Sequence, residues 1–540
     1  MATTVDEKQL AQEVEQLESS KLRTSQRAGD LTLVDDDGNT RRIPIPTNDP
    51  NDPLNFNKWR KLGILVSCCW FSIFSLVLVG GVGPIIPVFM DMYLPQGKTP
   101  DEIISLSTYP SVTMAGGAFI ILPLSMMFGR RPVFLGCCAL LIATTIGAAT
   151  AKTFEVHMAC RILQGVATGA TESVLPLIIT DVSFVNERGK WFAWYWGSQN
   201  FVNTVFTISS SYLVAATSWH WFYWVLAILE IVGTIGAFFL LPETMYTRSP
   251  MLLNGQVIHT DEFGVTIILT EEEARQRFGD QDMSGTAAGA TQKNTFLQEL
   301  KPHSGIAPNA LQVGGGAIWK MAQACSSPAI IWAILASSIS LGTGIAMTLV
   351  YGEVLTKGHG WSQASVGLIN VGIFPASIAA MVYAGWFGDK LNVFMAKRNH
   401  GIHTPEHTLL ILIFPAIASL IGIVAFAAGS NWPNRISDWG VIMGWTIFEF
   451  GFIVVLVTTT HFASEAIPNN PGPALAVVIG AKNVVSFGAS KGIVPMVHTF
   501  DYMVAFMILF GTFAAIFVLG IPLYLLNPMW RTAVAKKNRA

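Results

Sequence analysis

Long apolar runs alternate with short polar turns over most of the chain. A run of about 20 apolar residues is long enough to cross a hydrocarbon core of about 30 Å as a helix. By this measure the pattern predicts two sets of six membrane spans. The first set covers residues 62–90, 103–128, 132–151, 154–180, 191–217 and 219–241, and the second covers 328–355, 362–388, 408–429, 437–460, 472–498 and 501–526. The sequence therefore predicts an all-α membrane protein with twelve transmembrane helices in two six-helix bundles.

Polar segments divide this pattern into five parts. The predicted parts are an N-terminal tail (1–61), a first bundle (62–246), a linker (247–325), a second bundle (326–526) and a C-terminal tail (527–540). The first tail is polar, contains a proline-rich segment and has no signal-peptide core, so we expect it to be disordered and cytoplasmic. The linker is also polar, and we expect it to be flexible with one short helix over 271–278.

Two cationic turns occupy corresponding positions in the two halves. Gly129, Arg130 and Arg131 lie between the second and third spans, and Asp389 and Lys390 follow the eighth span. Repeated halves of this kind are typical of secondary transporters. We therefore expect these five residues to form a gate on the cytoplasmic side.

The positive charges predict the orientation of the chain. With both termini in the cytoplasm, four cations fall in outside loops: Lys98, Lys152, Lys357 and Arg435. Three more lie within spans: Arg161, Lys482 and Lys491. All other lysines and arginines then lie on the cytoplasmic side, as the positive-inside rule requires. The sequence thus predicts a multi-pass protein of the cell membrane, with the vacuolar membrane as the alternative.

The composition excludes several classes of protein. Of the 540 residues, 51% are hydrophobic and only 13% are charged, which excludes an ordinary soluble enzyme of this length. The net charge of −2 argues against a nucleic-acid partner. We find no metal-ligand spacing, nucleotide-binding loop or catalytic triad motif, so we expect no enzyme activity, no metal, no cofactor and no use of ATP. The expected partners are the lipid bilayer, protons and a small-molecule substrate, and we expect a monomer.

Six short motifs carry a family resemblance. They are Asp52–Arg60 before span 1, Gly83–Pro87 in span 1, Pro123–Pro132 after span 2, Arg161–Gly165 with Gly169 in span 4, Leu241–Tyr246 after span 6 and Arg398–His407 before span 9. In the order and spacing of these motifs, the chain resembles a twelve-span transporter of the major facilitator superfamily. More narrowly, it is similar to the fungal drug:proton antiporters, including their polyamine-transporter-like branch. The resemblance extends from about Asp49 to Arg531 and implies alternating access driven by protons.

The chain departs from the family pattern at three places. Met126 stands where the family usually has an acid before the cationic turn. The fifth span, around Gly197–Asn203, lacks the glycine-proline pattern associated with antiporters. An acid often seen before span 11 is replaced around Ala463–Ser464, although Glu465 is close by. These departures leave the expected fold intact but weaken the case for antiport.

Two charges in span 4 are candidates for the transport pathway. A charged side chain within a membrane is costly, so each one should face a cavity or a partner. Arg161 occupies the family's motif position and is expected either to bind a carboxylate or substrate, or to clamp neighbouring helices. Glu172 follows eleven residues later, which on a continuous helix places it about 20° from the face of Arg161 and about 16 Å deeper. We expect Glu172 to couple protons or bind cations; a simple bond to another helix is the alternative.

Other polar residues in the spans extend this candidate pathway. Glu449 in span 10 has phenylalanine on both sides and would suit an organic cation, unless it is a buried structural acid. Gln199 and Asn203 are four residues apart on one face of span 5 and are candidates for hydrogen bonds to a substrate. Lys482 and Asn483 lie near the cytoplasmic end of span 11, where their side chains would either extend to the membrane–water interface or have a packing or gating role.

Small and kinking residues predict breaks in spans 1 and 7. The first group is Gly80, Gly81, Gly83, Pro84 and Pro87, and the second is Gly342–Gly344. Breaks at corresponding places in two repeats indicate a binding site near the membrane midplane.

Together these features predict a proton-coupled secondary transporter that works by alternating access. Its expected task is efflux of a small organic molecule such as a drug, toxin or secondary metabolite. Uptake of polyamines or other organic cations is the alternative, favoured by the membrane carboxylates and by the missing span 5 pattern.

Overall fold

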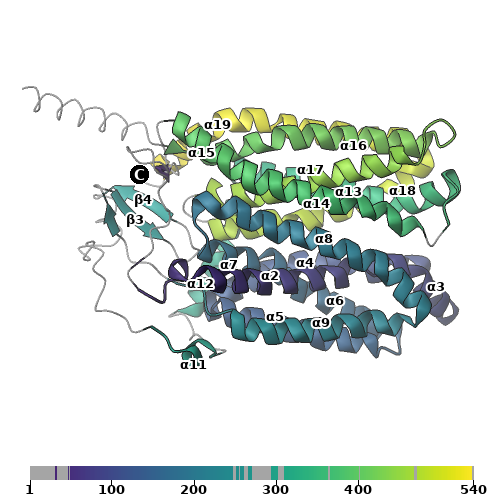
Figure 1. Ribbon diagram of the computed structural model, residues 1–540, viewed down its shortest axis with the longest axis horizontal. Coiled ribbons are helices and arrows are strands. Elements are labelled where there is room, and N and C mark those ends of the chain that lie inside the picture. Colours follow the sequence, from purple (N-terminus) through teal and green to yellow (C-terminus); the bar gives the residue numbers. More distant parts are fainter. Residues whose placement is uncertain are drawn as a thin grey trace, which may run out of the picture.

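Two helical bundles lie side by side in the computed structural model (Figure 1). The structure describes residues 31–32, 47, 49–246, 251–253, 256–260, 266–270, 293–301, 309–362, 365–399, 402–467 and 471–537. Helices satisfy their own backbone hydrogen bonds, which a membrane interior requires because it supplies no water. We call the end of the molecule that holds the linker strands the linker end, and the opposite end, where α3 lies, the far end.

Each half of the chain supplies the helices of one bundle. The first bundle contains α2 (Lys58–Gly80), α3 (Ile86–Tyr93), α4 (Pro100–Phe128), α5 (Arg130–Ala149), α6 (Phe154–Thr168), α7 (Val174–Val182), α8 (Arg188–Ala216) and α9 (Trp219–Leu240). The second contains α13 (Pro328–Glu353), α14 (Ile373–Met381), α15 (Gly388–Arg398), α16 (Ile413–Asn431), α17 (Trp439–Ala466), α18 (Pro471–Val518) and α19 (Gly520–Lys537).

The predicted arrangement of twelve spans in two bundles is confirmed. Within the described residues, ten helical stretches are long and apolar enough to cross a membrane. Two more spans complete the set, and one of them is span 5, formed by α8, which is 29 residues long but more polar because it contains Gln199 and Asn203. The other is span 11, formed by the first part of α18, which a kink at Asp501 (φ 68°) separates from span 12.

The breaks in the helices differ in part from the prediction. Span 1 is interrupted as expected, since α2 ends at Gly80 and a 3-10 turn over Gly83–Ile85 precedes α3. The predicted break at Gly342–Gly344 is wrong, because α13 runs through these residues without interruption. The irregular part of span 7 is a π-helical turn at Val354–Gly358. An interruption that was not predicted divides span 4, where a 3-10 turn over Gly169–Glu172 lies between α6 and α7.

The linker contains more regular structure than expected. The three strands β2 (Met251–Leu253), β3 (Gln256–Thr260) and β4 (Thr266–Thr270) form an antiparallel sheet in that order. The helices α11 (Phe296–Glu299) and α12 (Ala310–Ala324) follow. The short helix expected over 271–278 lies outside the described residues. In β3 and β4 the high content of β-branched residues favours strands, although the linker as a whole is polar.

A second, two-stranded sheet connects the N-terminal tail to the second bundle. Its strands are β1 (Leu31–Thr32) and β5 (Ile402–His403), which pair antiparallel with Leu31 opposite His403. The tail therefore contacts the loop between spans 8 and 9.

Close helix packing fixes the position of span 4. A Cβ atom on Gly165 would collide with the carbonyl oxygen of Pro110, and one on Gly169 would collide with the amide of Ala118. Small residues spaced four apart let helix backbones approach closely within a membrane. The contact holds span 4 against α4, which itself packs against α18 of the second bundle. On the other side of the interface, α8 packs against α14 and α17.

Candidate functional site

A buried ion pair joins the two bundles. Lys482 Nζ donates to Glu172 Oε1, and Asn483 Nδ2 donates to Glu172 Oε2. The side chains of Glu172 and Lys482 are only 3% and 4% exposed. Lys482 Nζ also donates to the carbonyl oxygen of Ile479 at 3.0 Å. One carboxylate from span 4 therefore accepts from two neighbouring side chains of span 11, both of which belong to the opposite bundle.

The break in span 4 positions this carboxylate. Glu172 is the last residue of the 3-10 turn, and Ser173 leaves helical geometry at φ −127° and ψ −73°. Neighbouring helices support the turn: Tyr195 Oη donates to the carbonyl oxygen of Thr171 at 2.7 Å, and the hydroxyl groups of Thr171 and Ser75 lie 3.1 Å apart. The turn that carries Glu172 is thus held by contacts that α2 and α8 make with Thr171.

One face of α8 beside this pair carries buried polar atoms without partners. The Lys482 ammonium lies 5.3 Å from the ring centroid of Trp196, the distance of a cation–π contact. Trp196, Gln199 and Asn203 are spaced three and four residues apart and so share a face of this helix. Trp196 Nε1, both polar atoms of Gln199 and Asn203 Oδ1 are buried and have no hydrogen-bond partner in the part of the chain that the structure describes. Unpaired buried polar groups are costly, so this face is suited to hydrogen bonding with a bound molecule.

Arg161 is placed away from the Glu172 contact. Its Nη1 and Nη2 donate to the carbonyl oxygens of Leu78 (2.7 Å) and Val79 (3.0 Å), and its Nε donates to that of Leu106 (2.9 Å). Arg161 Nη1 also donates to Gln164 Oε1 at 2.9 Å. These bonds match the alternative of a clamp, since they hold the end of α2 against α4. The continuous helix assumed between Arg161 and Glu172 is wrong, because α6 ends at Thr168 and a 3-10 turn carries Glu172.

Glu449 lies in a separate polar cluster of the second bundle. It is buried on α17, and a Cβ atom on Gly344 would lie 3.9 Å from Glu449 Oε1. Nearby, Trp445 Nε1 donates to Asn370 Oδ1 at 3.2 Å, and Asn370 Nδ2 donates to Tyr351 Oη at 3.4 Å. Glu449 therefore remains a candidate pathway residue, with aromatic and polar neighbours on spans 7, 8 and 10.

The predicted gate residues divide between the two bundles. The backbone amides of Arg130 and Arg131 donate to Glu243 at 3.0 and 3.3 Å, and Arg130 Nε lies 3.5 Å from Asp181 Oδ2. These contacts tie the cationic turn, which begins at Gly129, to other parts of its own bundle.

At the linker end, a contact between the bundles is made by the other cationic turn, which contains Asp389 and Lys390. Asp389 Oδ2 accepts a hydrogen bond from the backbone amide of Lys190 at 3.1 Å, and a Cβ atom on Gly189 would collide with Asp389 Oδ1. The Lys390 side chain packs within its own bundle, on the residue four positions earlier: its Nζ lies 3.8 Å from the ring centroid of Trp386.

A further buried cluster near this contact was not predicted. Glu465 Oε2 and Oε1 lie 3.0 and 3.2 Å from Nε2 of His403 and of His461. His461 also faces Gly189, since its Nδ1 would lie 3.4 Å from a Cβ atom there. The sequence signal for this cluster was the spacing of four between His461 and Glu465, which puts them on one helical face. The third member, His403, comes from another part of the chain and had no local signal.

The architecture and the site together define a class of membrane transporter. Two six-helix bundles meet along an interface that holds a buried ion pair and unpaired polar atoms, an arrangement typical of secondary transporters with a midplane site. The sequence profile of the Major Facilitator Superfamily matches residues 64–495. The chain belongs to this superfamily.

Relatives and solved structures agree with this assignment. An uncharacterised MFS-type transporter of Schizosaccharomyces pombe is 23% identical, with 84% of this chain and 81% of that protein covered. The MFS-type transporter atr4 of Stereocaulon alpinum is 26% identical (85% and 75% covered), and the efflux pump FUBT of Fusarium oxysporum is 24% identical (79% and 65% covered).

Among solved structures, the human organic anion transporter MFSD10 has a TM-score of 0.54 at 15% identity, with 86% of this chain and 99% of that chain covered. The proton:xylose symporter XylE has a TM-score of 0.53 at 14% identity, with 87% and 94% covered. Both likenesses concern the fold.

Proposed function

We propose that this chain is a proton-coupled secondary transporter that exports a small organic molecule by alternating access. The observation that carries the proposal is the Glu172 carboxylate, which accepts from Lys482 and Asn483 across the bundle interface. We further propose that it acts as a monomer in the cell membrane, with the linker end in the cytoplasm as the positive-inside pattern predicts.

Alternating access requires this ion pair to break. When the bundles rock apart around the midplane, span 4 and span 11 separate and both charges lose their partner. Removing one partner from a buried ion pair costs about 3–5 kcal/mol, because the other charge is left uncompensated. A transporter that opens at this point therefore needs a compensating event at the same residues.

A proton supplies that compensation for Glu172, while the Lys482 ammonium keeps its contacts with the Ile479 carbonyl oxygen and the Trp196 ring. The proton and the Lys482 ammonium compete for the same carboxylate oxygens, so protonation of Glu172 removes the attraction that holds the bundles together here. Loss of the proton on the other side of the membrane restores the pair and closes the interface. Opening thereby becomes linked to proton entry and closing to proton release.

The substrate is proposed to bind along α8. The unpaired atoms of Trp196, Gln199 and Asn203 supply hydrogen-bonding groups, and the Trp196 ring supplies an aromatic surface. Export is supported by the relative FUBT of Fusarium oxysporum, which is an efflux pump. Uptake of polyamines gains no support from the names of the relatives described above.

The test is a comparison of two matched double substitutions. Glu172→Gln with Lys482→Gln neutralises both members of the buried pair, so it avoids leaving a single buried charge. Glu155→Gln with Lys98→Gln does the same to an exposed pair at the far end, whose Nζ–Oε1 distance is 2.6 Å. Cells expressing each form would be loaded with a panel of fluorescent drugs, with and without a protonophore.

We expect the native protein and the Glu155/Lys98 variant to lower drug accumulation, and the protonophore to abolish this effect. The Glu172/Lys482 variant should reach the membrane and fail to lower accumulation. Export by this variant that still responds to the protonophore would contradict the role of Glu172. Export that ignores the protonophore in the native protein would contradict proton coupling.

A further inference from the structure

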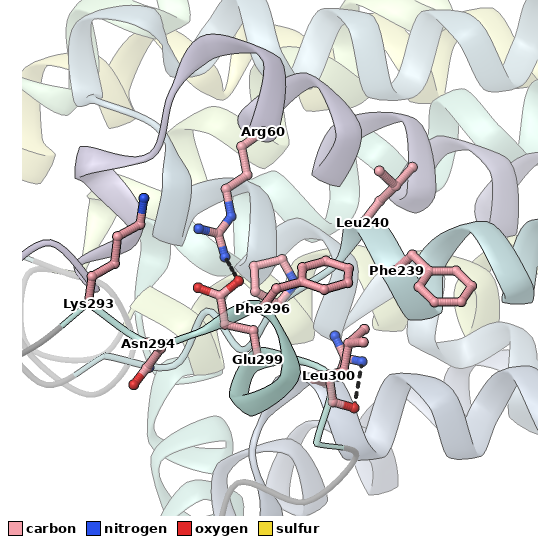
Figure 2. Close-up of a pocket in the computed structure, with 10 residues that line it drawn as sticks. Arg60, Phe239, Leu240, Lys293, Asn294, Phe296, Glu299 and Leu300 are labelled. Carbon is pink, nitrogen blue, oxygen red and sulfur yellow. Dashed lines mark hydrogen bonds and ion pairs between the residues drawn. The ribbon is translucent and has the colours of Figure 1, made fainter.

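A cavity lies at the linker end of the first bundle, apart from the bundle interface (Figure 2). Its volume is about 460 Å³, within the range of sites that hold small ligands. The wall consists of the first turns of α2 and α5, the last turn of α9 and the linker segment around α11. Three membrane spans and the linker thus meet around one hollow.

Cations outnumber anions in this wall. Among its ten lining residues are Arg60, Arg131 and Lys293, against one carboxylate, Glu299. Arg60 Nη2 lies 2.5 Å from Glu299 Oε2, and the two side chains point toward one another in Figure 2. Arg131 Nη2 donates to the carbonyl oxygens of Phe238 and Leu300, which fixes its charge within the wall. No ion pair of Lys293 occurs among the described residues.

The other side of the cavity is apolar and open. Phe239 and Leu240 at the end of α9 are 52% and 47% exposed, and Phe296 of α11 is 59% exposed. In α9 these residues end a membrane span, so their exposed surface faces the region where lipid head groups meet acyl chains. The cavity therefore offers positive charge and apolar surface side by side at the depth of a lipid head group.

We propose that this cavity binds one anionic phospholipid of the cytoplasmic leaflet. The phosphate lies near Lys293 and Arg60, and the acyl chains follow Phe239 and Leu240 along α9. Basic pockets at the cytoplasmic ends of membrane helices attract anionic head groups, both by direct contact and through the surface potential. A soluble phosphate would use the cations but leave the apolar rim exposed, whereas a phospholipid covers both.

Lipid binding at this place fastens the linker to the first bundle. Glu299 and Leu300 belong to the linker, while their partners Arg60 and Arg131 begin spans 1 and 3. A head group in contact with Arg60 and Lys293 adds a third connection between these parts.

The test uses the purified full-length protein in a neutral detergent and counts bound lipids by native mass spectrometry. Phosphatidylserine and phosphatidylcholine with identical acyl chains would be titrated separately, so that only the head-group charge differs. Lys293→Gln removes a cation that has no ion pair with any described residue and should leave folding intact. Lys301→Gln, a linker lysine that does not line the cavity, is the matched control.

We expect phosphatidylserine to be retained more tightly than phosphatidylcholine. Lys293→Gln should raise its dissociation constant about fivefold, the effect of one cation near a membrane surface, and Lys301→Gln should change it less than twofold. Equal retention of the two lipids, or an unchanged constant in Lys293→Gln, would overturn the proposal. Displacement of the lipid by millimolar inorganic phosphate would overturn it in favour of a soluble-phosphate site.

Discussion

Glu172 and Lys482 are 310 positions apart in the chain, yet their side chains form a buried ion pair between the two bundles. Each residue alone is unfavourable in a membrane, where an unpaired charge costs at least about 2.5 kcal/mol. The pair is therefore stable only while the bundles are in contact at this level. The energy of this one contact depends on the relative position of the bundles, and this dependence is what a transporter has to control.

A cycle of substitutions at the pair should separate stability from transport. Glu172→Gln and Lys482→Gln should each lower stability by about 3–5 kcal/mol, because each leaves one buried charge without a partner. The double variant should regain most of this stability, since no charge is left. Neither single variant nor the double variant should transport, because each lacks the proton-binding carboxylate of Glu172, the Lys482 ammonium that competes with the proton, or both. Thermal unfolding and drug export measured on the same preparations check both parts.

A double variant as unstable as the two single variants combined would show that the residues act independently. That result would contradict the cross-bundle pair.

Gln199→Leu should have opposite effects on stability and transport. Both polar atoms of Gln199 are buried without a partner among the described residues, at a cost of about 1–3 kcal/mol for such a group, so an apolar side chain of similar size should stabilise the protein. If Gln199 bonds a substrate, the same change should weaken substrate binding about tenfold, as expected for one lost buried hydrogen bond. Unfolding temperature and the substrate concentration for half-maximal export are the two measurements. Ser209→Ala, on an exposed position of the same helix, is the control and should change neither.

Much of the fold followed from the sequence, because the membrane restricts the chain to long apolar helices whose number and order can be read directly. The contact between Glu172 and Lys482 did not follow. The sequence identified both residues as charges within spans. It predicted Lys482 near the cytoplasmic membrane surface, however, and it did not predict the break after Thr168. That break has no proline before it and depends on Gly165 and Gly169 packing against α4, a tertiary contact that has no signature in the local pattern.

Substitution of Arg161 distinguishes its two interpretations. Arg161→Met removes the donors to Leu78, Val79 and Leu106 and leaves three buried carbonyl oxygens without them, which should lower stability by more than about 2 kcal/mol. Arg161→Lys should be intermediate, because a single ammonium cannot reach as many acceptors as the planar guanidinium. Thermal unfolding in detergent measures the effect, with Arg435→Gln in a far-end loop as control. Unchanged unfolding combined with lost export would instead support the prediction that Arg161 contacts substrate or protons.

The close contact of Gly189 with Asp389 should hold the two bundles together at the linker end. A methyl group on Gly189 collides with Asp389 Oδ1, so Gly189→Ala should push α8 away from the start of α15 and favour conformations that are open at this end. Asp389→Ala should act in the same direction by removing the acceptor for the Lys190 amide, whereas Asp389→Asn keeps an acceptor oxygen and should have a smaller effect. Spin labels on Lys58→Cys and Lys397→Cys, in a background without the native cysteines, report the distance between the bundles at the linker end. We expect more of the longer distances in Gly189→Ala and Asp389→Ala than in Gly136→Ala, where a methyl group meets no atom within 4 Å. An identical distance distribution in all four forms would mean that the Asp389 contact does not hold the linker end closed.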